Sequence, residues 1–454
     1  MNAKSVSLSM LLLLGVAVVA FDCFESRELV PDDREEILFW HFWGGEDRQV
    51  VDDVVRRFND SQEEFFVRAV AMPGNNLDVK LFLSVTGGNP PDVINQDDPI
   101  VADWAHRGAL MPLDEIAVPK EIDEARKWLF PAARSLTEFD GRMYGLCNAL
   151  DIRALYYNKT LLDEHNLEPP KTTDDLMTIA EQLSPTDKDG RRQRFGYLPD
   201  SRRLWAWGVV FGGDFVDSEN RVTANDPRIV KALSWMQSFS RRFGPDEVAA
   251  FRQGDQSLPG KTFPLLPAGN ASPHGRYAVI MDGQWRVRDI ARSQQSRREA
   301  GLAVAEYGAC PLPTPADGRQ RAGWVNGNFF LVPQGAKNPR GAWAFMKFWS
   351  GLGGHEADAA QTCMKGGWIP VSQSVVDQQE FQEYLEAEPL FREFVELAAS
   401  PNQIPIPVIP GAPYFNREIK SVGGHTMSDL AVSPAELLSD ASHRIQKQFD
   451  RIGK

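Results

Sequence analysis

The sequence predicts an α/β protein built from two lobes. A chain of 454 residues is too long for one ordinary hydrophobic core. Its first ordered part also alternates strand, loop, helix and strand, a pattern that places the first loop at the carboxyl end of a strand. The apolar run 36–40 predicts the first strand and ends at Gly44 and Gly45. Residues 46–59 predict an amphipathic helix, and residues 65–71 predict the second strand.

Further elements follow from the same signals along the chain. Apolar periodicity, β-branched runs and turn clusters separate helices from strands. Thr172 or Thr173 is a plausible N-cap for one of these helices. No repeat of 20 to 50 residues is visible, which argues against solenoids and propellers. The predicted helices are 79–85, 172–183, 339–350 and 434–451, and the predicted strands are 92–94, 278–281 and 329–332.

The stretch 140–164 is the most informative part of the sequence. Two short apolar runs, 143–146 and 154–157, predict buried strands on either side of a polar break. Asp151 and Arg153 lie in this break, two residues apart, so their side chains are expected on the same side of an extended chain. Such a position suits a hinge or a ligand cleft, and a structural ion pair between the two residues is the alternative.

The N-terminus differs from the rest of the chain. Lys4 precedes an apolar run from Val6 to Phe21, so residues 1–22 are predicted to be a signal peptide or an N-terminal anchor. The run is short for a membrane span. Cys23 raises the possibility of lipidation, although Phe21 and Asp22 are not the small residues that usually precede a modified cysteine. Residues 23–35 are polar and are predicted to be a tether.

Composition and motifs argue against several classes of function. A net charge of -13 does not suit a nucleic-acid-binding surface. The sequence contains no nucleophile elbow, HExxH, Walker or GxGxxG motif, and its seven histidines lack paired ligand spacing. We therefore predict no catalytic residue, metal or cofactor. A glycosidase stays open because its two carboxylates need no sequence spacing. A disulfide between Cys310 and Cys363 also stays open.

Tryptophans beside loop residues are the main indication of a ligand. An indole face is a good platform for a sugar ring, and nearby carboxylates and amides bind its hydroxyl groups. The alternative for each such tryptophan is a place in the core, which we expect for Trp235, Trp343 and Trp349. Turn chemistry is the alternative for the acids. The predicted ligand-binding residues are Trp43, Glu46, Asp97, Asp98, Asp151, Trp205, Asp282, Trp285, Trp324, Asn326, Trp368, Tyr414 and Arg417.

An ordered set of motifs resembles a known family. The motifs are FWHFWGGEDRQVVDDVVRRFN at 39–59, GGNPPDVINQDD at 87–98, YAVIMDGQWRV at 277–287, GWVNGNFFLVP at 323–333 and GGWIPV at 366–371. Together with 140–164, they resemble the family-one extracellular solute-binding proteins of ABC importers, which include maltose and glycerol-phosphate binders. One departure is the Cys147-Asn148 pair, which stands where the family has a proline-containing turn.

The resemblance implies a two-lobed, hinge-linked periplasmic-binding-protein fold of type II, each lobe a central sheet flanked by helices. It implies an N-terminal lobe of 36–150 plus about 311–360, and a C-terminal lobe of 151–310 plus about 361–454. The implied chain crossings are near Leu150-Asp151, near Cys310 to Pro315 and in Gln361 to Gly367. It also points to Trp43, Asp98, Asp151, Trp285, Trp324 and Trp368 as ligand neighbours.

The function that the resemblance implies is that of the extracytoplasmic substrate-binding component of an ABC importer. Such a protein binds a mono- or oligosaccharide between its lobes and delivers it to the permease transmembrane subunits. We expect an exported monomer, periplasmic or extracytoplasmic, with an N-terminal anchor as an option. The alternatives are an exported carbohydrate-active enzyme and a binding protein for a phosphorylated polyol. In the last case Arg153 or Arg417 is expected to face the cleft.

Overall fold

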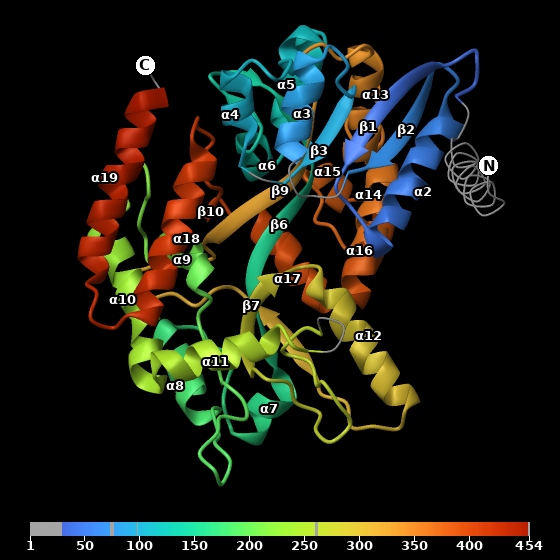
Figure 1. Cartoon of the computed structure of the whole chain (residues 1–454). Coiled ribbons are helices and arrows are strands. Elements are labelled where there is room, and N and C mark those ends of the chain that lie inside the picture. Colours follow the sequence, from blue (N-terminus) through green and yellow to red (C-terminus); the bar gives the residue numbers. More distant parts are fainter. Residues whose placement is uncertain (1–29, 73–76, 98, 259–261, 453–454) are drawn as a thin grey trace, which may run out of the picture.

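Two α/β lobes joined by long shared strands form the protein (Figure 1). This computed structural model describes residues 30–72, 77–97, 99–258 and 262–452. The predicted signal peptide or anchor at 1–22, Cys23 and Asp98 lie outside the described residues. In these ranges, no helix combines the length and the apolar character that a bilayer span requires. The predicted fold class is confirmed.

The central sheet links the lobes. Its main path runs β2-β1-β3-β9-β6-β7, with β8 on β6 and β10 on β9. Strands β1, β2 and β3 are parallel, and β9 runs antiparallel to β3 and β6. The strands within the described residues are β1 (Glu35–His41), β2 (Phe65–Ala71), β3 (Val93–Gln96), β4 (Glu138–Phe139), β5 (Arg142–Met143), β6 (Gly145–Asn158), β7 (Val279–Gly283), β8 (Tyr307–Cys310), β9 (Gly323–Leu331) and β10 (Gln403–Ile404).

Helices cover the first-lobe sheet. Helix α2 buries the valine and phenylalanine stripe that the sequence predicted and carries Glu46 and Asp47 in its first turn, where the helix dipole favours acids. The other helices of this lobe are α3 (Leu77–Thr86), α4 (Val101–His106), α5 (Pro119–Trp128), α6 (Pro131–Ser135), α13 (Pro339–Ser350), α14 (Glu356–Gly366), α15 (Gln373–Val376) and α16 (Gln379–Ala387), and α2 itself spans Gly45–Ser61. Helix α17 (Pro389–Ala398) packs on β6 and β8.

The second lobe surrounds the far half of β6 (Figure 1). Thr172 caps α8 in a reciprocal capping box: the Asp175 N–H donates to Thr172 Oγ1, and the Thr172 N–H donates to Asp175 Oδ2 at 2.8 Å. The helices of this part are α7 (Lys159–Glu164), α8 (Thr173–Gln182), α9 (Leu204–Val210), α10 (Pro227–Phe243), α11 (Pro245–Asp255), α12 (Arg286–Glu299), α18 (Ala412–Ser428) and α19 (Pro434–Ile452).

Strand β6 corrects the prediction for residues 140–164. The predicted polar break between two short strands is wrong, because Gly145–Asn158 is one continuous strand. Its first half pairs with β9 through Ile152, and its second half pairs with β7 from Arg153 onward. A register shift between Cys147 and Ala149 leaves Asn148 as a bulge. Inter-strand hydrogen bonds thus continue through the polar residues, and the strand changes lobes without a loop.

The chain crosses between lobes three times, and two crossings differ from expectation. The first lies at Ile152 and Arg153 in β6, close to the expected position. The second lies within β9 instead of at Cys310–Pro315, because β9 pairs with β3 at one end and contacts α9 at the other. The expected third crossing at Gln361–Gly367 is wrong. That segment ends α14, where Gly367 has the left-handed φ of +62° that suits a C-terminal cap.

The apolar side chains also place the segment after α13 in the first lobe. Helix α14 packs on α2 and α13, and α15 and α16 pack on α14, whereas α17 packs on β6 and β8. The sequence predicted 361–454 in the second lobe. The chain is back in the second lobe at β10, which pairs with the second-lobe end of β9. The expected core tryptophans Trp343 and Trp349 are buried, and Trp235 is half-buried against the second-lobe cluster. Cys147, Cys310 and Cys363 are free thiols.

Candidate functional site

A cavity of about 530 Å³ lies where the two lobes meet. The loop after β1, the crossing strands β6 and β9, the N-terminus of α12 and helix α18 supply its walls. These elements bring together residues separated by more than 300 positions in sequence, because β6 and β9 run side by side through both lobes. The side chains that line it include Trp43, Glu46, Asp47, Asp97, Asp151, Arg153, Gln284, Trp285, Trp324, Asn326, Asn328, Trp368 and Lys420.

An arginine lies between two indole rings in this cavity. The guanidinium carbon of Arg153 is 4.4 Å from the ring centroid of Trp285 and 4.5 Å from that of Trp324. Both distances are within the range of a cation–π contact. Arg153 is 6% exposed, while the two tryptophans are half-buried. Burial, followed by the charge of Arg203, lowers the pKa of Arg153 to about 10. The guanidinium therefore stays charged at neutral pH.

Gln284 holds the crossing point of β6. Its side-chain amide donates to Asp151 Oδ1 at 2.9 Å and to the Leu150 carbonyl at 3.2 Å, and its carbonyl accepts from the Ile152 N–H at 3.3 Å. Gln284 is 1% exposed. The alternative of an ion pair between Asp151 and Arg153 is not what the structure has, because Asp151 is bonded to this amide. A residue of the β7–α12 turn is thus fixed to the strand that joins the lobes.

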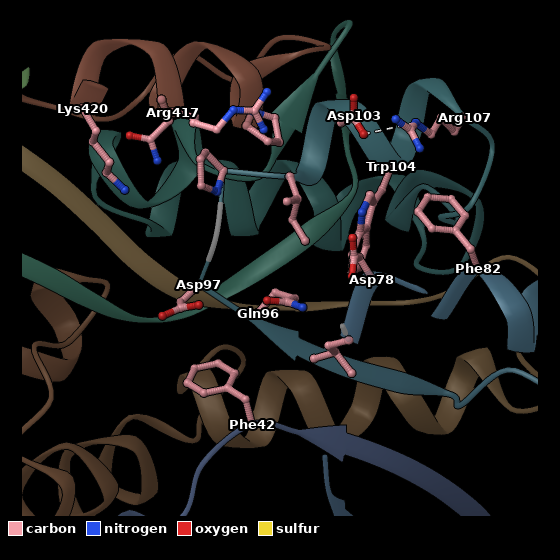
Figure 2. Close-up of a pocket in the computed structure, with 15 residues that line it drawn as sticks. Phe42, Asp78, Phe82, Gln96, Asp97, Asp103, Trp104, Arg107, Arg417 and Lys420 are labelled. Atoms are coloured by element: carbon pink, nitrogen blue, oxygen red, sulfur yellow. Dashed lines mark ion pairs between the residues drawn. The ribbon is translucent and has the colours of Figure 1, made fainter. Parts of the chain in front are cut away.

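A second, larger cavity of about 930 Å³ continues from the first. The two cavities share Phe42, Asp97, Pro99, Asn416 and Lys420 in their walls. Figure 2 shows the larger one, with Asp97 and Gln96 at the end of β3 and Phe82, Trp104 and Arg107 on the α3 and α4 side. The walls alternate aromatic rings with charged and amide groups, so they can contact both the faces and the hydroxyl groups of a sugar chain.

Two ion pairs form one rim of the smaller cavity. Glu46 and Asp47 in the first turn of α2 pair with Arg292 at 2.7 Å and Arg288 at 2.9 Å. Both arginines lie on α12, which continues from the second-lobe strand β7. Because the partners come from separate elements around the cavity, the pairs connect its two sides. Their exposure to solvent makes them sensitive to salt.

Eight of the predicted site residues line the smaller cavity: Trp43, Glu46, Asp97, Asp151, Trp285, Trp324, Asn326 and Trp368. Trp43 and Trp368 are mostly covered, at 6% and 5% exposure, because each stacks on the core residue Trp349. Little of either side chain is therefore open to the cavity. Asp97 belongs to both cavities, and Asn326 donates a side-chain hydrogen bond to its carbonyl.

The other predicted residues lie elsewhere. Arg417 lines the larger cavity. Trp205 is buried in the second-lobe core and donates its Nε1–H to the Ile404 carbonyl at 3.0 Å. Asp282 lines neither cavity and pairs with Arg286 at 2.9 Å. Tyr414 also lies outside both, with the Arg417 guanidinium over its ring at 5.1 Å.

Sequence reasoning missed much of the charged wall. Arg288 and Arg292 are four residues apart, directly after Trp285, so they share one face of the following helix. That spacing next to a predicted site residue is a usable signal. Asp47 directly follows the predicted site residue Glu46, so it could have been predicted from its position as well. Phe82, Trp104 and Lys420 carried no such signal, because only the packing of the lobes brings α3, α4 and α18 to one cavity.

Comparisons with known proteins agree on the fold. A structure of CpMnBP1 with mannotriose bound superposes with a TM-score of 0.72 at 21% identity, covering 90% of this chain and 100% of that one. The GacH receptor of Streptomyces glaucescens GLA.O gives a TM-score of 0.70 at 22% identity, covering 92% of this chain and 99% of that one. Both likenesses fall below 25% identity and bear on the fold alone.

Sequence relatives point to the same class of protein. A maltooligosaccharide ABC transporter solute-binding lipoprotein of Streptococcus pneumoniae is 26% identical over 282 residues, which cover 59% of this chain and 58% of that protein. The maltotriose-binding protein of Pyrococcus abyssi is 21% identical over 353 residues, covering 76% of this chain and 69% of that protein. The chain thus spans little more than half of the first of these relatives.

Residues 53–389 match the model of a family described as bacterial extracellular solute-binding protein. With about three quarters of its length inside that match, the chain belongs to the bacterial extracellular solute-binding protein family.

Proposed function

We propose that this protein is the extracytoplasmic substrate-binding component of an ABC importer and that it binds an oligosaccharide between its lobes. The observation that carries the proposal is the position of Trp285 and Trp324, two half-buried indoles facing one cavity beside Asp151 and Asn326. Rings supply contact area for the apolar faces of a sugar, and the carboxylate and amide orient its hydroxyl groups. The names of the relatives support a saccharide.

The joined cavities favour a ligand of several sugar units. The smaller cavity alone has about 530 Å³ and the larger about 930 Å³, within the range of drug-sized ligand pockets. Aromatic rings are available in both, since Phe82 and Trp104 line the second one. Closure of the two lobes around such a ligand selects a closed arrangement from an existing equilibrium. The proposed partners are permease transmembrane subunits, and the proposed location is outside the cytoplasmic membrane.

A carbohydrate-active enzyme is supported less well by the cavity. A glycosidase needs an acid kept protonated at the scissile bond. Burial raises the pKa of Glu388 and of Glu393. Neither residue lines either cavity. The relatives named above are binding proteins. These observations favour capture of the ligand without chemistry on it.

Titration calorimetry with a saccharide panel tests the proposal. The panel contains maltotriose, mannotriose, cellotriose and the matching monosaccharides. We expect binding of at least one trisaccharide, and a Trp285→Ala affinity lower by about 10- to 100-fold. Trp235→Phe is the matched control, because Trp235 packs on Trp207 and Phe239 away from both cavities. A folded protein that binds no saccharide contradicts the proposal, as does a Trp285→Ala variant with unchanged affinity for the ligand found.

A further inference from the structure

Arg153 is the most deeply buried arginine among the described residues, and it has no carboxylate partner there. It is 6% exposed, and no acidic oxygen lies within 4.0 Å of its guanidinium in the described part of the chain. Its Nε is buried without a hydrogen-bond partner, and within the described residues its guanidinium makes one long hydrogen bond, of 3.4 Å, to the Ile152 carbonyl. A buried charge without a partner is costly, so it needs a reason.

Other arginines of this protein show how such a group is normally satisfied. Arg192 also lies between two rings, Phe195 at 5.3 Å and Phe243 at 5.4 Å, but it pairs with Glu247 at 3.1 Å. Arg297 is buried to a similar degree and donates to three backbone carbonyls. Within the described ranges, Arg153 has no carboxylate partner and only one long hydrogen bond to a backbone carbonyl. The difference is its location, because Arg153 lines the interlobe cavity.

The surroundings of Arg153 leave its edge for a ligand. The centroids of the Trp285 and Trp324 rings both lie within 4.5 Å of the guanidinium carbon, and the N–H groups of a guanidinium point outward in its own plane. That arrangement fixes a flat, forked donor in one orientation, which suits a carboxylate or phosphate. Asp151, the nearest acid on the same strand, is engaged by Gln284, and Asp282 is engaged by Arg286. Arg203 lies 5.5 Å from the centroid of the Trp324 ring and adds positive charge near Arg153.

The larger cavity is also lined by an arginine that stacks on a ring and, among the described residues, has no ion pair. Among the arginines that stack on a ring within the described ranges, Arg417 is the other one without an ion pair. It is exposed and lines the larger cavity, whereas stacked arginines outside the cavities, such as Arg242 and Arg276, pair with Glu181 and Asp255. Both ring-stacked arginines without a carboxylate partner in the described ranges thus line a cavity, although Arg107 and Arg286 also stack on rings and line the cavities while paired with Asp103 and Asp282.

We propose that the bound saccharide carries an anionic group, a carboxylate or a phosphate, which Arg153 recognises from within the Trp285–Trp324 slot. This inference rests on the proposed function and narrows its ligand class to acidic saccharides. The anion supplies the missing partner of a buried cation, and the indoles exclude water from the pair. A neutral sugar of the same shape leaves Arg153 unpaired and displaces water from it without compensation.

Calorimetry on the purified protein with matched ligands decides the point. Maltotriose, mannotriose and cellotriose are each compared with the same sugar carrying a terminal 6-carboxylate or a terminal phosphate. We expect one acidic form to bind about 10-fold or more tightly than its neutral parent. The carboxylate and phosphate arms identify which anion is preferred. Binding of the neutral parent as tightly as both acidic forms overturns the inference and leaves the proposed function standing. No binding to any of the sugars overturns both.

Variants test the residue itself. Arg153→Gln is expected to lose about 10-fold or more in affinity for the acidic form and to change little for the neutral form, and Arg153→Lys is expected to keep part of the preference. Arg192→Gln, at the ring-stacked arginine outside the cavities, is the control and should leave both affinities unchanged. If Arg153→Gln binds the neutral form more tightly and binds the acidic form with unchanged affinity, Arg153 does not recognise the anion, and the inference is wrong. If Arg153→Gln does not fold, the comparison of acidic and neutral saccharides on the wild-type protein still tests the inference.

Discussion

His41 makes the protein's stability depend on pH in a way that the structure allows us to work out. It is the last residue of β1, is 1% exposed, and lies 5.4 Å from the Phe39 ring and 6.0 Å from the Trp43 ring. Its Nδ1 is buried without a partner. Burial, aided by the charge of Arg48, lowers the pKa of His41 from 6.5 to about 4. The folded protein therefore holds the imidazole neutral.

The sign of the effect follows from the two states. In the unfolded chain His41 takes up a proton as the pH falls through 6.5, while in the folded chain it does so only near 4. Proton uptake by the unfolded state thus removes stability as the pH falls between those values. Linkage gives a loss of about 2 kcal/mol between pH 7 and pH 5, rising to roughly 3 kcal/mol by pH 4. Below the folded pKa the loss becomes constant.

The variant His41→Phe isolates this contribution. Phenylalanine keeps a ring between Phe39 and Trp43 and cannot titrate. Urea unfolding at pH 7 and pH 5 gives the change in free energy for each protein, and the difference between the two changes is the contribution of His41. We expect the wild type to lose about 2 kcal/mol more than the variant over this interval. Equal losses in the two proteins refute the reasoning, whatever their absolute stabilities.

Three further predictions concern other parts of the molecule. Asp92→Ala should lower the free energy of unfolding by about 3 kcal/mol in urea, because each oxygen of this buried carboxylate accepts from a backbone N–H; a loss below about 1 kcal/mol contradicts this. Replacing Arg288 and Arg292 together by Met should weaken ligand binding by about 2- to 10-fold at low salt and by less at about 0.5 M salt, as measured by calorimetry. The effect is expected to be small and salt-dependent because exposed ion pairs are weak and screened. A loss of affinity that does not depend on salt contradicts this prediction. Burial raises the pKa of Cys310 and Cys363 to about 12, so both should resist iodoacetamide at pH 8 until urea unfolds the chain, as read by peptide mass mapping; rapid native labelling rules this out.

Local sequence signals were enough to predict helices and strands whose apolar residues follow a clear period. The predicted helix 339–350 matches α13, and the predicted strand 65–71 matches β2, because their apolar periods are long and bounded by proline or polar turns. Thr172 as a cap was predictable from Asp175 three residues later. Strand β6 was missed as a single element, since its polar residues looked like a break. Pairing with β9 and β7 on either side stabilises such residues, and that pairing is not local.

Part of the candidate site was also predictable. Trp285 follows the strand β7, Trp324 lies at the start of β9, and both line the cavity between the lobes. Trp205 had equally suggestive neighbours but is buried in the second-lobe core, because its whole helix is covered there. The sequence around a tryptophan does not show whether its indole faces a ligand or the core. Only the packing around it distinguishes the two.

The sequence by itself determined the class of protein, an α/β chain in two lobes with ordered motifs of the solute-binding family, because such motifs depend on local strand, turn and helix preferences. The tertiary structure alone decided the site. It joined the segment after α13 to the first lobe, engaged Asp151 with Gln284, and left Arg153 between two indoles without an acid. Those outcomes depend on contacts between residues more than 100 positions apart, and burial and charge pairing arise only when such contacts form.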